Sequence, residues 1–242
     1  MKKILSVLLA LCLVLAAVPA AGIVVSADET FGDFTYNKTF FGVLEITGYN
    51  GSSAEITIPS QIGDEAVTAI GGNAFRNNTA ITSVEIPSTV KTIDYNAFQG
   101  CEALRSITVP DSVTKVETYA FDGCSALKTV VIGSGLAKID FGVFRNCISL
   151  EKVTLGANVT TIDTAFSDCT ALSEIVWNDK IETIGDRAFS DCTALRSLSI
   201  PASVKTIGSS AFSGCTGLND VDLGINLEKI DANAFGGCKG IK

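Results

Sequence analysis

Seven of the eight cysteines recur at a fixed spacing and are the first residues that could carry chemistry. In an exported protein such residues would suggest disulfide bonds. Cysteines stacked in a column at about 5 Å per repeat would, however, point in parallel directions, and a straight column cannot supply the four tetrahedral ligands of a zinc site. We therefore interpret each as a small buried side chain with a weak donor facing a turn. They lie 22 or 23 residues apart, at Cys101, Cys124, Cys147, Cys169, Cys192, Cys215 and Cys238.

Acidic side chains form a second column that could bind a cation. Each carboxylate is expected to cap the short turn that follows it by accepting backbone N–H groups. The alternative is a divalent cation, Ca²⁺ for example, held between neighbouring repeats through oxygen ligands. Apart from that candidate metal column we expect no cofactor. Its members are Asp94, Glu117, Asp140 and Asp163.

Catalysis is disfavoured by the residue types that are missing from the sequence. The chain contains no histidine, which removes the commonest general base near neutral pH and the commonest metal ligand. No phosphate-binding glycine motif follows an expected strand. Paired carboxylates could in principle hydrolyse glycosides, yet every Asp and Glu lies in a repeating or turn position without a distinctive partner. We therefore expect no enzyme, with a glycoside hydrolase as the least favoured function.

A repeat of about 23 residues positions these side chains. Within one unit Ile107 and Val109 alternate as in a strand, and Pro110 ends the pairing because it has no N–H to donate. The stretch that begins at Ala120 and Phe121 suits one short helical or 3₁₀ turn. One unit cannot bury enough apolar surface to offset its ordering entropy, so the units should stack as parallel coils. The marker phenylalanines are Phe75, Phe98, Phe121, Phe144, Phe166, Phe189, Phe212 and Phe235, with a single step of 22 residues.

The unit pattern Leu-x-x-Ile-x-Ile-Pro-x-x-Val-x-x-Ile-x-x-x-Ala-Phe-x-x-Cys resembles the BspA-like leucine-rich repeat family, from Phe34 to the C-terminus. The resemblance implies a secreted or surface protein, bacterial in most relatives, that adheres to host or neighbouring-cell components. The expected fold class is α/β: a β-rich leucine-rich-repeat solenoid of about eight coils, with short parallel strands and one short helical turn per coil.

Three segments are expected along the chain. Residues 1–27 are typical of a signal peptide, with Lys2 and Lys3 before an apolar run and a small-residue cleavage site before Asp28. A membrane anchor is the alternative, but the run is shorter than the roughly 20 residues that span a bilayer, and no other stretch could span one. Residues 28–66 form an N-terminal cap hairpin and the first strand, and residues 67–242 form the solenoid, whose last unit is incomplete.

Charge also limits the partners. Removal of Lys2 and Lys3 changes the formal net charge from −8 to −10, so the mature chain lacks the positive stripe that nucleic-acid binding needs. We expect a secreted or cell-surface location and no membrane span after signal cleavage.

The solvent side of the expected strands is the surface on which such solenoids usually bind, so we predict the partner there. The favoured function is recognition or adhesion to a protein or glycan, and the alternative is a structural spacer or surface-layer scaffold without a specific ligand. The predicted partner-binding face is Glu85, Thr108, Val131, Thr154, Val176, Ser199 and Asp222, flanked by Ser83, Ser106, Thr129, Lys152, Glu174, Ser197 and Asp220.

The few aromatic residues outside the repeat position allow two interpretations. Tyr95 and Phe141 share one turn position, and Tyr119 lies one residue further along its own unit. They form either an exposed edge for sugar or protein contact, or packing across the turn. Trp177 is expected in the core next to the 22-residue unit, where we predict a local distortion.

Overall fold

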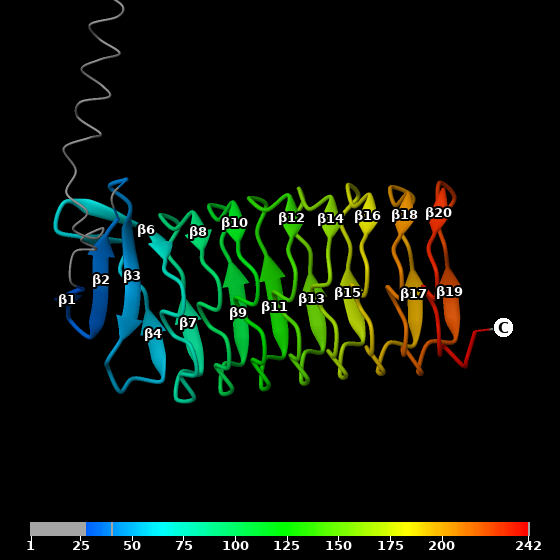
Figure 1. Ribbon diagram of the computed structural model, residues 1–242, viewed down its shortest axis with the longest axis horizontal. Helices are drawn as coiled ribbons and strands as arrows, with labels where there is room; N and C mark the ends of the chain where they lie inside the picture. Colours follow the sequence, from blue (N-terminus) through cyan, green and yellow to red (C-terminus); the bar gives the residue numbers. More distant parts are fainter. Residues whose placement is uncertain (1–27, 40, 242) are drawn as a thin grey trace, which may run out of the picture.

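The computed structural model describes residues 28–39 and 41–241 as one elongated stack of coils (Figure 1). The expected signal peptide, with Cys12, lies outside the described residues. The first row of parallel strands carries the predicted binding face, and each strand pairs with its equivalent one coil away, except that the ladder is interrupted between β15 and β17. Its members are β4 (Glu55–Thr57), β7 (Ser83–Glu85), β9 (Ser106–Val109), β11 (Thr129–Ile132), β13 (Lys152–Thr154), β15 (Glu174–Val176), β17 (Ser197–Ser199) and β19 (Asp220–Asp222).

A second row of parallel strands, each two residues long except for β6, lies along the other edge of the stack (Figure 1), and its ladder is interrupted between β10 and β12. The register within both rows is in line, so that Val130 faces Ile107 and Val153, and Ile184 faces Ile162 and Ile207. The predicted parallel coils of about 23 residues are therefore confirmed. The second row consists of β6 (Glu65–Ile70), β8 (Thr92–Ile93), β10 (Lys115–Val116), β12 (Lys138–Ile139), β14 (Thr161–Ile162), β16 (Thr183–Ile184), β18 (Thr206–Ile207) and β20 (Lys229–Ile230).

The helical turn expected in each coil is not confirmed, and the described residues contain no helix. Tight turns stand in its place, because two positions have positive φ in every coil except the short one, such as Asn96 at 54° and Gly100 at 70°. A positive φ interrupts a right-handed helix and turns alternate N–H groups outward. Thus Gln99 N donates to Asn96 O inside the turn, whereas Phe98 N donates to Ala120 O of the next coil at 2.7 Å. The turns therefore make a third set of coil-to-coil hydrogen bonds.

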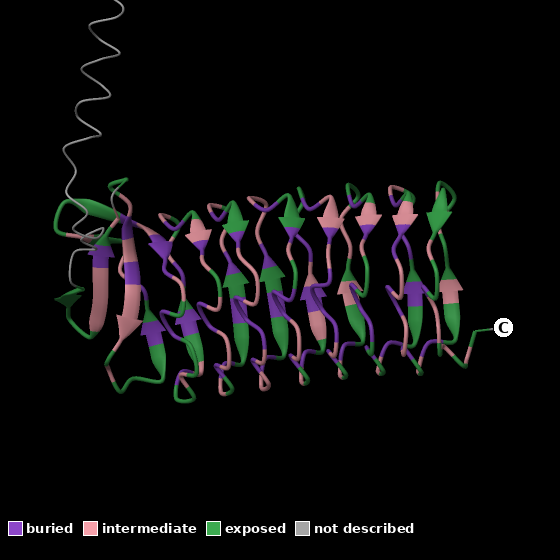
Figure 2. Cartoon of the chain, viewed as in Figure 1, coloured by how far each residue is buried: buried purple, intermediate pink, exposed green. Residues whose placement is uncertain are grey.

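The core is one continuous cluster of buried side chains. Both strand rows and the segments between them contribute buried residues to it (Figure 2). The eight repeat phenylalanines stack with ring centroids 4.8–5.4 Å apart and planes within 9° of parallel. Seven of them are almost fully buried, and Phe235 in the last coil is half-buried. Trp177 is half-buried and meets the Phe189 ring edge-on at 5.8 Å, so it packs against the core as expected without being enclosed by it.

The N-terminal end of this column is covered by a hairpin. Strands β1 (Glu29–Phe31), β2 (Phe34–Lys38) and β3 (Leu44–Tyr49) pair antiparallel in that order, and β3 then pairs in parallel with β6. Strand β5 (Gln61–Ile62) pairs antiparallel with the start of β6. Tyr49 lies 6.4 Å from the Phe75 ring and 5.1 Å from Phe34, so the hairpin continues the aromatic stack and shields its first member.

The apolar side chains of the last described coil are much more open. Leu223 is 36% exposed and Ile230 is 46% exposed, whereas Ile200 and Ile207, their equivalents one coil earlier, are 3% and 0% exposed. The difference follows from position, because an inner coil is covered on both sides and the last one on a single side.

Candidate functional site

The predicted partner-binding face lies on the solvent side of the first strand row. Alternation of the strands buries Val130 to 1% exposure and leaves its neighbour Val131 at 42%. Thr154 alone of the seven predicted residues is half-buried, and the others are exposed. We call the solvent-facing surface of the first strand row the strand strip: Glu85, Thr108, Val131, Thr154, Val176, Ser199 and Asp222, with the flanking series Ser83, Ser106, Thr129, Lys152, Glu174, Ser197 and Asp220.

The central column of the strand strip is mostly uncharged, and its margins carry charged side chains. Val131 and Val176 are its two exposed apolar side chains, and uncharged Thr108 and Thr154 lie in the same column. Charged neighbours pair from coil to coil, for example Lys152 Nζ with Glu174 Oε1 at 2.6 Å. Such exposed pairs contribute little to stability, so the strip is available for contact.

One edge of the strip is hollowed beside β9, β11 and β13, where glycine follows two of the strands in place of the proline found in other coils. Gly133 and Gly156 line a shallow depression of about 470 Å³ with Pro110 and Val131. A Cβ atom on Gly156 would come within 2.0 Å of Gly133 O. Only glycine lets the backbones of the two coils come this close, because it has no Cβ atom. The missing side chains also leave the depression unfilled.

The acidic column caps turns at two of its positions and pairs with lysine at the others. Asp94 Oδ1 accepts the N–H of Tyr95 at 2.7 Å, and Asp163 Oδ1 accepts that of Thr164 at 2.9 Å. Lys138 Nζ lies 2.8 Å from Asp140 Oδ1 and 3.4 Å from Asp163 Oδ2.

Glu117 pairs in the same way with Lys115. The carboxylates raise the pKa of both lysines through hydrogen bonding. Among the residues that the structure describes, no three His, Cys, Asp or Glu side chains converge as a metal site.

The cysteine column has the geometry expected of buried donors. Each Sγ donates to the carbonyl oxygen of a phenylalanine in the preceding coil, from Cys101 to Phe75 at 3.1 Å through Cys238 to Phe212 at 3.1 Å. All seven are free thiols. Burial raises the pKa of Cys101 to about 12, which suppresses the reactive thiolate.

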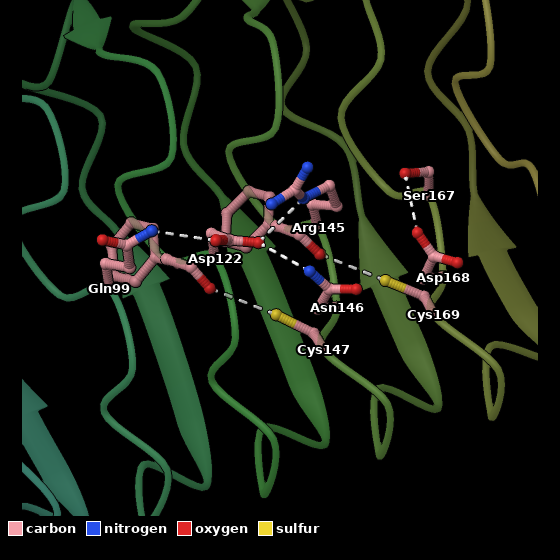
Figure 3. A network of polar contacts seen from close by, with 10 residues as sticks. Gln99, Asp122, Arg145, Asn146, Cys147, Ser167, Asp168 and Cys169 are labelled. Atoms are coloured by element: carbon pink, nitrogen blue, oxygen red, sulfur yellow. Dashed lines mark hydrogen bonds and ion pairs between the residues drawn. The ribbon is translucent and has the colours of Figure 1, made fainter. Parts of the chain in front are cut away.

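A buried carboxylate on the turn side joins three coils and was not singled out from the sequence. Asp122 is 6% exposed. It accepts hydrogen bonds from Gln99 Nε2 at 2.9 Å, Arg145 Nε at 3.1 Å and Asn146 Nδ2 at 3.0 Å (Figure 3). The Asp122 hydrogen bond raises the pKa of Arg145. A sequence signal existed: Gln99, Asp122 and Arg145 follow successive repeat phenylalanines, so polar groups of complementary type share one column.

The aromatic residues of the turn positions both pack across the turn and remain partly exposed. Phe141 packs edge-on against Tyr119 at 5.4 Å and 89°, while the Arg145 guanidinium lies 5.0 Å above the Tyr119 ring. Phe141 nevertheless stays 41% exposed and Tyr95 51% exposed. Packing across the turn therefore fixes the ring of Phe141 while leaving part of it in solvent.

Within the described residues no helix is long and apolar enough to cross a membrane. The sequence pattern of the family described as BspA type Leucine rich repeat region matches in six copies, over residues 49–165 and 163–242. No curated protein matches the chain.

Two crystal structures show the similarity of the fold. A leucine-rich repeat protein from Eubacterium ventriosum is 28% identical with a TM-score of 0.65, covering 74% of this chain and 49% of that one. A T. pallidum leucine-rich repeat protein is 25% identical with a TM-score of 0.60, covering 89% of this chain and 91% of that one. The chain thus spans about half the length of the first relative and most of the second.

Proposed function

Because the chain belongs to the BspA-type leucine-rich repeat family, which suggests a protein-interaction or surface module, we propose that it is an extracellular recognition module that adheres to a protein partner through the strand strip. The proposal includes export through residues 1–27 and no catalysis. The absence of histidine from the sequence supports the second part.

The observation that carries the proposal is the exposure of Val131 and Val176 in a row of uncharged side chains. The two valines are 42% and 36% exposed, whereas Val130 and Ile132 on the opposite face of β11 are 1% and 3% exposed. Apolar centres within a charged rim are the usual composition of protein interfaces. A strand face without a deep cavity suits a protein surface better than a small molecule.

The size of the strip predicts weak binding by one module. Seven strands at about 4.8 Å spacing give a strip of roughly 350 Å², less than half of the roughly 800 Å² that one partner buries in a standard interface. We therefore expect modest affinity for a single site and stronger adhesion where several modules engage one partner.

The test uses the chain from Asp28, since the described fold is formed within residues 28–241. Binding is measured by interferometry against a panel of extracellular matrix proteins and a glycan array. We expect at least one protein to bind, and Val131→Glu with Val176→Glu to weaken it about tenfold or more because a buried charge is costly at an interface.

Ile148→Glu is the matched control, because Ile148 is an exposed aliphatic residue (51%) outside the strand rows. Equal binding by the strip variant and this control would show that another surface is used. A wild-type chain that binds nothing in either panel would favour the alternative of a structural spacer or surface-layer scaffold.

A further inference from the structure

The turn side of the solenoid is hollowed at its one shortened coil, between Phe144 and Phe166. In neighbouring coils two residues lie between the acidic or glycine position and the residue before the repeat phenylalanine, as Phe141 and Gly142 do between Asp140 and Val143. The second of these two residues has positive φ. In the short coil Thr164 alone lies between Asp163 and Ala165. The short coil therefore lacks the position with positive φ. In the coils around it, that position is occupied by Tyr119, Gly142, Arg187 and Ser210, with φ between 52° and 67°.

The missing residue draws the turn of the short coil inward. Thr164 is only 9% exposed and donates its hydroxyl to Asp186 O at 2.8 Å. The turns on both sides keep their full length and project beyond it. The result is a hollow of about 570 Å³, within the range of roughly 300–1,000 Å³ that small-molecule sites occupy.

Polar groups line the floor and walls of this hollow. The hydroxyls of Thr164 and Ser167 lie at its base, and Asp168, Asp186 and Arg187 come from two successive coils. Ser167 and Asp168 are hydrogen-bonded to each other at 3.3 Å (Figure 3). Carboxylates accept two hydrogen bonds side by side, and guanidinium groups donate two. A carboxylate or a guanidinium can therefore bind two neighbouring hydroxyl groups of one ligand at the same time.

Phe141 supplies a preformed apolar plate at the wall of the same hollow. Its ring is held edge-on by Tyr119 and remains 41% exposed. Arg145 also lines the hollow and is held by the buried Asp122 (Figure 3). Its guanidinium lies over the Tyr119 ring as well. Because these side chains are already fixed by other contacts, little conformational entropy is lost when a ligand binds.

The charge of the lining limits the ligand. Three carboxylates, those of Asp168, Asp186 and Asp191, face two guanidinium groups, and that of Arg145 is already paired with Asp122. An anionic ligand would therefore be repelled. A flat ring with an apolar face and a rim of hydroxyl groups matches the Phe141 plate, the three carboxylates as hydrogen-bond acceptors and the Arg187 guanidinium as a donor.

We propose that this hollow, the turn-side hollow, binds an uncharged saccharide of one or two rings, with Phe141 stacked on the sugar face. The site lies on the turns rather than on the strand strip, so it goes beyond the protein contact proposed above. It would give the module a glycan specificity that is independent of its protein partner.

The test measures saturation-transfer NMR and titration calorimetry of the chain from Asp28 with free glucose, galactose, mannose and N-acetylglucosamine and with lactose, cellobiose and chitobiose. We expect at least one to bind at millimolar concentration. Phe141→Ala should weaken that binding by about fivefold or more, the loss expected for one aromatic contact. Insertion of one asparagine between Thr164 and Ala165 should abolish it by restoring the full-length turn.

Tyr95→Ala is the matched control, because Tyr95 holds the same turn position two coils earlier, is exposed and does not line the hollow. Unchanged melting temperatures show that the variants fold. The proposal is overturned if no saccharide of the panel binds the wild type, or if binding survives both Phe141→Ala and the insertion. Saccharide binding that persists in the Val131→Glu and Val176→Glu variant separates this site from the strand strip.

Discussion

The thiols of the repeat show how a single side chain is tuned by its place in the stack. Each cysteine donates to the carbonyl of a phenylalanine one coil earlier, and such a carbonyl can also accept a backbone N–H in its own turn, as Phe98 O does from Cys101 N at 3.1 Å. Burial raises the pKa of Cys101 and of Cys215 to about 12. The thiols are therefore structural donors, and their protonation is coupled to folding.

This coupling predicts a loss of stability at alkaline pH. An unfolded thiol ionises at about pH 8.5, whereas the raised pKa of about 12 keeps Cys101 and Cys215 protonated in the fold at that pH. Between these values the unfolded chain binds fewer protons, so the free energy of unfolding falls as pH rises, by about 1.4 kcal/mol per pH unit for each such thiol. Urea unfolding at a series of pH values measures the slope.

The double variant Cys101→Ala, Cys215→Ala is the comparison that isolates the thiols from lysine and tyrosine. Its stability should fall less steeply above about pH 8.5 than that of the wild type. Parallel slopes for the two proteins would contradict the assignment of raised thiol pKa values.

At the scale of the element, each coil depends on its neighbours through the phenylalanine stack. Phe144 is 1% exposed and lies between Phe121 and Phe166, with centroid distances of 5.2 and 5.3 Å. Phe235 is half-buried and stacks on Phe212 alone among the described rings. The same aromatic residue should therefore have unequal energetic weight in the middle and in the last coil.

We expect Phe144→Ala to lower the free energy of unfolding by about 3–5 kcal/mol, since it opens a cavity that flanking coils cannot fill. Phe235→Ala should cost about half as much or less, because the side chain is already partly solvated and less surface is lost from burial. Equilibrium urea denaturation of the two variants gives the comparison. Equal losses would show that the end of the stack is as tightly covered as its centre.

At the scale of the whole molecule, the column that most resembles a cation site is partly neutralised by two lysines of the chain itself. Lys138 lies between Asp140 and Asp163, and Lys115 pairs with Glu117. Lysine ammonium groups between coils reduce the repulsion that a stack of carboxylates would otherwise cause. A bound Ca²⁺ would have to displace these contacts.

We therefore expect the melting temperature to be the same in millimolar Ca²⁺ and in EDTA. A Ca²⁺ ion bound at a hundred times its dissociation constant would stabilise the fold by about 2.7 kcal/mol and raise the melting temperature by about 5–10 °C. Differential scanning calorimetry distinguishes the two outcomes. A rise of that size, lost in Asp140→Asn but kept in Asp94→Asn, would place a cation between the middle coils after all.

The 23-residue period by itself determined which residues share a column. In a stack of parallel coils, residues at equivalent positions must overlie one another, so Phe121 meets Phe144 and Val130 meets Ile107 with no further information. The buried phenylalanines, the free thiols and the exposed strand strip could be predicted for that reason. The predicted segment boundaries at 1–27, 28–66 and 67–242 and the binding role of the strip stay predictions.

Only the tertiary structure decided the conformation of the turns and what the turn side can hold. Turns with positive φ at Asn96 and Gly100 form instead of the expected helix. They are stabilised by backbone hydrogen bonds to the next coil, and a single unit has no next coil to bond to. The bonds of Asp122 and the hollow above Thr164 likewise depend on how far side chains reach across neighbouring coils. A period specifies which residues are neighbours, whereas depth, rotamer and the effect of one missing residue arise only from packing in three dimensions.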